Sequence, residues 1–332
     1  MMKTGKKGAI GLTIAAMAVA GCGGDDDPAA GNGSVSVLLE AEGTITDGIE
    51  AGDGEEDIRD GWGVAYDRYV VVIGEISIHL STDSSVEASD PAVLAVDLTT
   101  VPADGLPLWS IADLREGEWD FNYGIHSAAE GAERDDSVSQ ADFDAMAAAD
   151  ATYRVAGTMA KADGQSCPPK GLAMSGSAVA TGTNAGGDDC YANASIHFDL
   201  LVPAETSFGP CEIDEMPGFS VAADSATTVA ATIHGDHLFF NGFPEGSEGG
   251  VTRLAQWLAD CDLDLDGEVT RAELEAIAPS DLAELDDRYQ LGGSPITPLA
   301  TMWSYVVGQL KTQGHFQGEG ECPFDGMVHD HD

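Results

Sequence analysis

The feature that most constrains this chain is a period-two alternation of apolar and polar residues that recurs between residues 34 and 243. Successive side chains of a strand point to opposite faces, so this alternation predicts half-buried β-strands. The segments are rich in Val, Ile, Thr and aromatic residues, and clusters of Gly, Pro, Asp and Ser separate them. Examples are YDRYVVVIGEISIHLS, EWDFNYGIHSA, NASIHFDLLVP and ATTVAATIHG. Roughly seven or eight such strands predict an antiparallel β-sandwich or open barrel over residues 35–243.

Two segments add detail to this β domain. Trp119, Phe121 and Tyr123 alternate along one strand, so we expect all three on one face, in the core. The segment SVSQADFDAMAAADATY interrupts the strand pattern and predicts a short helix that carries Phe143 and Met146 on one side.

Past residue 243 the periodicity becomes helical. Apolar residues from Val251 to Cys261 follow the i, i+3, i+4, i+7 spacing of a helix face. A further amphipathic helix is expected to begin at Thr297 and Pro298 and to run through Leu310. The sequence therefore predicts a mainly β protein with α-helices. A small helical module over residues 244–318 follows the β domain, and residues 319–332 form a C-terminal tail.

The helical module contains the segment CDLDLDGEVTRAEL, residues 261–274. Three aspartates stand on alternate positions, Gly267 follows where the chain must turn sharply, and a glutamate stands twelve places from the first aspartate. The candidate ligands are Asp262, Asp264, Asp266, the carbonyl of Glu268, Thr270 and Glu273. Hard oxygen donors in this number suit Ca²⁺ better than Mg²⁺, which demands a tighter octahedron. The alternative is a solvated acidic loop that binds no metal.

These twelve residues and their flanking helices resemble the EF-hand family. The resemblance implies one calcium ion bound by the loop, with Val269 as the apolar residue that the family has at the eighth position. EF-hands that sense calcium work as pairs, and no second loop is present in this sequence. A single loop therefore indicates a structural calcium ion that holds the helical module in place.

The N-terminus predicts export. A basic start precedes an apolar run over residues 9–20, which is too short to span a bilayer as a helix, so residues 1–21 read as a signal peptide. Val-Ala-Gly-Cys at its end resembles the lipobox of bacterial lipoproteins, which implies acylation of Cys22 and a membrane anchor. Gly23, in place of Asp, favours the outer membrane over the inner one. Residues 22–34 have the composition of a flexible tether. An ordinary secretory signal with an incidental cysteine is the alternative.

Charge excludes some partners. Three of the 14 Lys and Arg residues and none of the 58 Asp and Glu residues precede Cys22, so the chain after cleavage carries a formal charge of −47. Such a surface repels nucleic acid and anionic headgroups and attracts divalent cations. Adaptation to saline surroundings explains the charge equally well. Hydrophobic residues make up 43% of the chain, which indicates a packed core despite the acidity.

The cysteines predict a disulfide framework. Five remain besides Cys22, and export makes disulfides the default. Cys167 and Cys190 bracket a loop rich in small residues and are expected to pair. Cys211 with Cys322 is the expected second bridge, which leaves the thiol of Cys261 free.

A second candidate site is the segment TIHGDHLFF, residues 232–240. Gly235 and Asp236 can turn the chain, so His234 and His237 could reach one side. Imidazoles would select copper, zinc or nickel over calcium. Ordinary hydrogen-bonded histidines at strand ends are the simpler interpretation. His315 is expected at the end of the last helix.

Two resemblances extend beyond the acidic loop. The segments RDGWGVAYDRYVVVIGEISIHL, TIHGDHLFF and GHFQGEGEC, with the EF-hand, are similar in order to an uncharacterised group of bacterial lipoproteins. More distantly, the β domain with its paired cysteines is similar to methanobactin-linked periplasmic copper-binding proteins, which implies copper binding and a haem oxidoreductase as partner.

These patterns support one main expectation and one alternative. The main expectation is a lipid-anchored, non-enzymatic envelope protein that binds calcium, because the sequence has no Gly-x-Ser-x-Gly, His-Glu-x-x-His or phosphate-binding glycine loop. The alternative is a periplasmic protein that binds copper or zinc through His234 and His237.

Overall fold

The computed structural model describes residues 32–174, 178–214, 216–244, 250–282 and 288–325. The predicted signal peptide, Cys22 and most of the predicted tether lie outside these residues. The described residues group into one compact unit. Within the described ranges, no helix is both long enough and apolar enough to cross a membrane.

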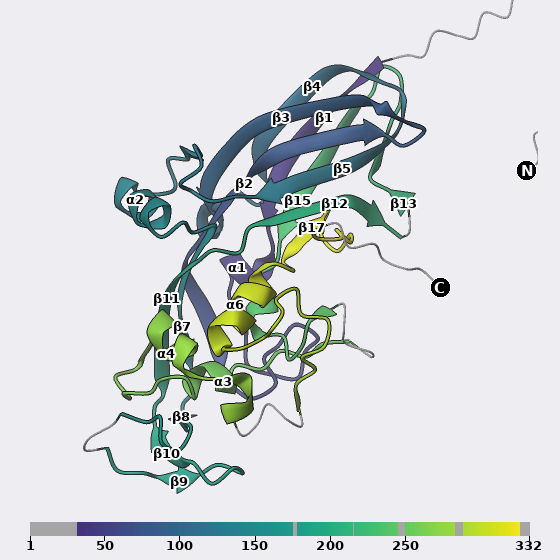
Figure 1. The fold of residues 1–332 in the computed structure, drawn as a ribbon. Helices are drawn as coiled ribbons and strands as arrows, with labels where there is room; N and C mark the ends of the chain where they lie inside the picture. The colour runs from purple at the N-terminus through teal and green to yellow at the C-terminus, as the bar shows by residue number, and fades with distance from the viewer. Residues whose placement is uncertain (1–31, 175–177, 215, 245–249, 283–287, 326–332) are drawn as a thin grey trace, which may run out of the picture. The chain divides into compact units, whose positions relative to one another are not determined.

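The fold is mainly β, as predicted, and curled sheets form a half-barrel with a few helices (Figure 1). In the described chain the largest sheet has the order β13-β12-β5-β2-β7-β11-β16, with β3 and β14 added beside β2 and β5, and β6 beside β3. Its longer strands are β2 (Gly63–Leu80), β3 (Asp83–Asp97), β5 (Gly117–Ile125), β7 (Tyr153–Ala160), β11 (Ser195–Val202) and β12 (Thr206–Ile213). Its short strands are β6 (Glu133–Arg134), β13 (Met216–Pro217), β14 (Phe219–Val221) and β16 (Glu268–Val269).

A second sheet has the order β17-β15-β1-β4. Its strands are β1 (Asn32–Ala41), β4 (Leu106–Arg115), β15 (Ala226–Ile233) and β17 (Gly314–Phe316). A small third sheet joins β8 (Gln165–Ser166), β10 (Asp189–Ala192) and β9 (Gly182–Thr183).

The pairing is not antiparallel throughout. β1 and β15 run parallel, from Ser34 beside Ala226 to Ala41 beside Ile233. Parallel neighbours cannot be joined by a hairpin and need a long connection, and here most of the β domain supplies it. Alternation within each segment predicts a strand but carries no information on the direction of its partner.

The predicted aromatic face lies in the core. Trp119, Phe121 and Tyr123 are all buried, as expected. The ring of Phe121 lies 4.9 Å from that of Phe316, and Tyr123 stacks on Phe208 at 5.1 Å. Burial of each such side chain contributes about 1.5–3 kcal/mol to folding. Because Phe316 comes from the C-terminal part, these contacts tie that part to the β domain.

The helices are short. They are α1 (Gly43–Thr46), α2 (Gln140–Ala148), α3 (Gln256–Ala259), α4 (Arg271–Ala276) and α6 (Met302–Leu310), with 3-10 turns at Leu98–Thr100, Asp236–Phe239 and Pro279–Asp281. α2 is the helix predicted inside the β domain, with Met146 buried. α6 begins at Met302, after its N-cap Thr301, whereas the sequence predicted a start at Thr297 and Pro298.

The helix expected from Val251 to Cys261 is shorter than predicted. Only α3 is helical, because the residues before it pair with the segment after β15. The N–H of Asn241 donates to the carbonyl of Thr252 (2.8 Å), and the N–H of Leu254 donates to that of Phe239 (2.7 Å). These hydrogen bonds to residues 239 and 241 occupy the carbonyl of Thr252 and the N–H of Leu254, which a longer helix would use.

The cysteine predictions are confirmed. Cys167 is bonded to Cys190 and Cys211 to Cys322, while Cys261 is a buried free thiol. Part of the predicted tail is ordered around the second bridge, since residues 321 and 324 form β-bridges with residues of β12.

The two bridges close loops of very different length, with sequence separations of 23 and 111 residues. Loop-closure entropy gives about 3.4 kcal/mol for the first bridge and about 4.8 kcal/mol for the second. Replacing Cys211 and Cys322 together with alanine should therefore destabilise the protein more than the matched Cys167→Ala, Cys190→Ala pair. Urea unfolding of both variants measures the difference. If the Cys211, Cys322 variant lost the same or less free energy of unfolding than the Cys167, Cys190 variant, the larger contribution of the longer loop would be contradicted.

Candidate metal centres

Among the described residues, three groups of side chains could hold a metal ion, and because two of them share His234 they lie in two places. The first is the acidic loop, residues 262–273, between α3 and α4. Its centre forms β16, which pairs in parallel with β11, so that Val269 lies beside Phe198. The N–H of His197 also donates to the carbonyl of Gly267 (2.8 Å). The β domain therefore supports this loop directly.

Three of the six predicted loop ligands converge through their side chains. Asp262, Asp264 and Glu273 each place a carboxylate oxygen within 4.8 Å of the others. Gly267 turns the chain between them with a φ of 86°, a value that glycine adopts without strain. Carboxylates this close repel one another, so a cation among them would relieve the repulsion.

Asp262 is the most enclosed of the three. Its side chain is fully buried, and Oδ2 accepts hydrogen bonds from the N–H of Gly267 (3.1 Å) and the amide of Asn193 (2.9 Å). Its Oδ1 is buried and has no hydrogen-bond partner. Burial raises the pKa of this carboxyl to about 6, and the nearby charge of Glu273 adds to the rise. A buried acceptor without a partner is costly, so this oxygen needs a further ligand.

Glu273 links both ends of the loop. Its Oε1 accepts from the N–H of Leu263 and its Oε2 from the N–H of Thr270, each at 2.8 Å. Thr270 is also the N-cap of α4, so its hydroxyl belongs to a capping box. Asp266 accepts a hydrogen bond from the N–H of Glu268 (2.8 Å) and lies outside the converging group. The Glu268 and Asp266 side chains are exposed.

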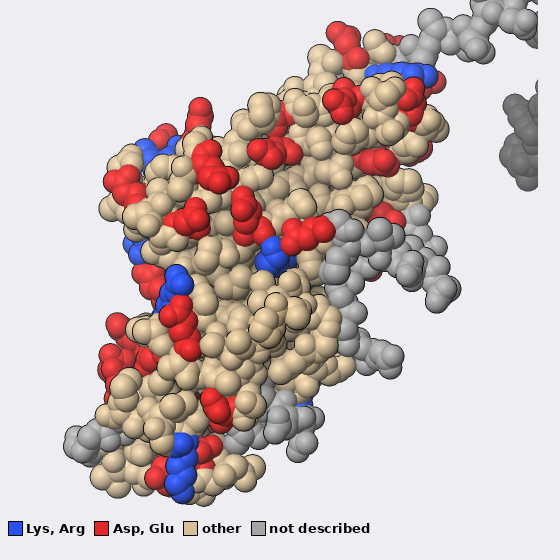
Figure 2. Space-filling model, in the orientation of Figure 1, with Lys and Arg blue, Asp and Glu red and all other residues tan. Residues whose placement is uncertain are grey.

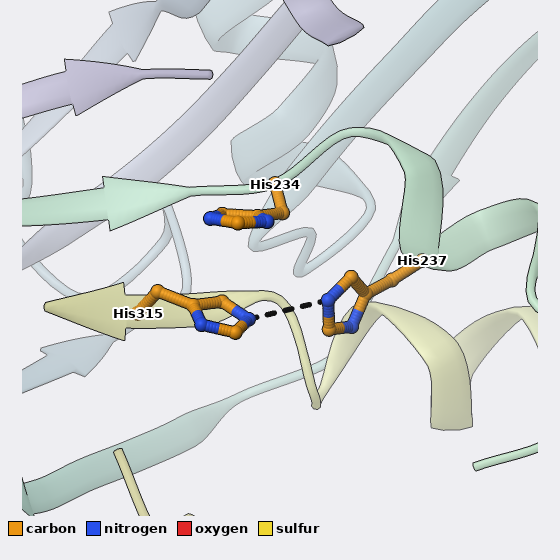
Figure 3. A group of neighbouring side chains, drawn as sticks. All are labelled: His234, His237 and His315. Atoms are coloured by element: carbon orange, nitrogen blue, oxygen red, sulfur yellow. Dashed lines mark hydrogen bonds between the residues drawn. The ribbon is translucent and has the colours of Figure 1, made fainter. Parts of the chain in front are cut away.

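The second group consists of three histidines from two parts of the chain (Figure 3). His234 directly follows β15, His237 lies in the 3-10 turn Asp236–Phe239, and His315 lies in β17. The Nε2 atoms of His237 and His315 are 3.2 Å apart, and the ring of His234 stacks on that of His315 with centroids 3.9 Å apart. The turn at Gly235 thus brings the two predicted histidines together, as the sequence analysis expected.

The hydrogen bonds of His237 define its tautomer. The hydroxyl of Thr312 donates to the carbonyl of Gln309 (2.9 Å), so it must accept from Nδ1–H of His237 (2.8 Å). Nε2 of His237 then carries a lone pair toward His315. Burial lowers the pKa of both His237 and His315 well below the usual value, and the neighbouring imidazoles lower it further. Neutral rings are the form that binds a metal ion.

Two carboxylates lie beside the histidines. Oε2 of Glu42 is 3.5 Å from Nδ1 of His234, and burial together with the charge of Asp236 raises the pKa of Glu42. Asp236 is fully buried; its Oδ2 accepts from Nε of Arg253 (2.6 Å), while its Oδ1 has no partner. Glu42, His234 and Asp236 also place ligand atoms within 4.8 Å of one another.

His315 and Glu42 are the residues that sequence reasoning missed in this group. His315 was expected at the end of the last helix, but α6 ends at Leu310 and His315 pairs with Thr232 across β17 and β15. Glu42 follows β1, whose last residue lies beside Ile233. No local pattern predicts either placement, because both depend on strands far apart in the sequence.

The other histidines lie elsewhere or outside the described residues. His79 contacts Glu87, His126 lies near Glu75 and His197 hydrogen-bonds to Thr158. His329 and His331 are in the part of the tail that the structure does not describe.

The geometry therefore offers two places for a metal ion, one rich in oxygen and one rich in nitrogen. Comparisons with protein-family models, curated proteins and solved structures give no match to this chain.

Proposed function

We propose that this protein is a lipid-anchored envelope protein that binds one calcium ion through the loop of residues 262–273. The observation that carries this proposal is the convergence of the carboxylates of buried Asp262, exposed Asp264 and buried Glu273. Calcium–oxygen distances are about 2.3–2.6 Å, so oxygens on opposite sides of one ion lie about 4.6–5.2 Å apart. The three carboxylate oxygens lie within 4.8 Å of one another, which is close enough for all three to contact one ion.

Further features support calcium over other cations. The three converging donors are carboxylate oxygens, hard ligands of the kind that calcium prefers, and Oδ1 of Asp262 is buried without a hydrogen-bond partner. Figure 2 shows Asp and Glu side chains scattered over the visible face, with only a few Lys and Arg residues among them. A negative surface raises the local concentration of divalent cations. Affinity in the range of about 10⁻⁴–10⁻³ M suffices outside the cell.

The contacts of the loop favour a structural role for the ion. The loop joins α3 and α4 to β11 through β16, and to the residue after β10 through the hydrogen bond from Asn193 to Asp262. A cation bound by the three carboxylates would connect these elements at one point. Calcium then stabilises the folded protein in the oxidising, calcium-containing surroundings where disulfides persist.

Calcium binding is directly testable on the full chain. Calorimetry should detect one calcium ion per chain, and calcium at about 100 times the Kd should stabilise the protein by about 2.7 kcal/mol. The midpoint of thermal unfolding should rise accordingly. Magnesium at the same concentration should produce a much smaller rise, because it requires a tighter octahedral site.

A matched pair of variants assigns the ion to this loop. Glu273→Gln removes one charge from a ligand and should weaken calcium binding by about tenfold or more. Glu275→Gln removes the same charge from an exposed position on the same helix, where the carboxylate forms an ion pair with Arg271 (2.7 Å), and should leave binding unchanged. Equal calcium affinity in the two variants would remove this loop as the site.

The lipid anchor is a separate part of the proposal. Cys22→Ala should shift the protein from the membrane fraction to the soluble fraction and remove the acyl mass from its N-terminus, because the thiol is the proposed attachment point. Cys261→Ala, at the buried thiol, serves as the control and should stay with the membrane. Gly23→Asp should redirect the anchored protein to the inner membrane. A membrane-bound Cys22→Ala protein would refute anchoring at this residue.

A further inference from the structure

The histidine group has a spacing that suits a shared metal ion. Two imidazole nitrogens bound to one ion at about 2.0–2.1 Å, with a tetrahedral angle between them, lie about 3.3–3.4 Å apart. The Nε2 atoms of His237 and His315 are 3.2 Å apart. We propose that His237 and His315, with His234 as the third imidazole, bind one transition-metal ion of the zinc or copper class.

Some polar atoms in and beside this histidine group are buried and have no hydrogen-bond partner within the protein. A single hydrogen bond between His237 and His315 uses one nitrogen of each ring, and Nδ1 of His315 is buried without a partner. Oδ1 of Asp236 is also buried without a partner. Buried polar groups that serve only to stabilise a fold are normally all hydrogen-bonded. This group instead has the unused capacity of a site that receives a ligand.

Neighbouring side chains hold the rings in the way that metal-binding histidines are held. The hydroxyl of Thr312 accepts from Nδ1 of His237 and so directs its Nε2 lone pair toward His315. Glu42 lies 3.5 Å from Nδ1 of His234 and the carbonyl of Gly318 lies 3.1 Å from its Nε2, so a bound ion would replace one of these two partners. Carboxylates and hydroxyls in such positions orient the ring and increase its basicity as a ligand.

The donor set and the surroundings indicate the class of metal. Imidazole nitrogen suits zinc, copper and nickel, whereas calcium takes oxygen ligands. The carboxylates of Glu42 and Asp236 lie close enough to offset the charge of a bound cation. His237 and His315 also line a pocket of about 320 Å³, together with Thr312 and Phe324. Both histidines therefore border a space large enough for an ion.

Zinc binding to the full chain tests the proposal. The protein is purified without chelators for elemental analysis. It is then stripped of metal, saturated with calcium and titrated with Zn²⁺ and, separately, with Cu²⁺. We expect one transition-metal ion per chain besides calcium. His315→Ala removes a direct ligand and should weaken binding at least about 100-fold, and Glu42→Gln, which acts through His234, about 10–100-fold. Co²⁺ in place of zinc should give visible absorption bands that His315→Ala loses.

Controls separate this site from the acidic loop and from misfolding. His79→Ala removes a histidine that lies outside the group, beside Glu87, and should bind zinc like the parent protein. Glu273→Gln should lose calcium affinity and keep zinc affinity, so the two sites can fail independently. Thermal unfolding without metal checks that His315→Ala is folded, and Glu42→Gln provides a milder second variant. Parent-like zinc and copper affinity in both variants, or no transition metal bound by the parent, would overturn the proposal.

Discussion

The arrangement of the histidine group depends on the hydrogen bonding between strands that are far apart in the sequence. β1 pairs with β15 and β15 with β17, which joins residues 32–41, 226–233 and 314–316 in one sheet. The ends of these strands carry Glu42, His234 and His315 into one place. Loop closure over such separations costs entropy, and the buried aromatic contacts between β5, β12 and β17 help to offset it. The second disulfide acts on the same part of the fold, because Cys211 and Cys322 tie β12 to the chain after β17.

The acidic loop is organised differently, since all of its candidate ligands lie within twelve residues. Its local hydrogen bonds run between neighbours, as from Thr270 to Glu273 and from Glu268 to Asp266. The β domain places a strand beside Val269, the contact that a second loop supplies in paired EF-hands, and Asn193 adds a polar partner for Asp262. These contacts give a physical reason why a single loop can be ordered in this protein.

Alternation in the sequence predicted the β domain, the buried face of Trp119, Phe121 and Tyr123, and the interrupting helix α2. These features depend on which side of an element is apolar, and that information is local. The helix expected before the acidic loop was too long because pairing with residues 239–241 took its first backbone groups. The parallel direction of β1 and β15 could not be predicted for a similar reason, since it depends on a partner nearly two hundred residues away.

The sequence by itself determined the mainly β class and the twelve-residue spacing of the acidic loop, and it favoured the cysteine pairs that the structure has. Periodicity and ligand spacing are properties of short segments, so they can be read without a fold. Only the tertiary structure decided that His315 and Glu42 join His234 and His237, that Asp262 is fully buried and that β11 supports the loop. Each of these depends on burial and on strand pairing across the chain, and the free energy of such contacts arises only when the whole core is assembled.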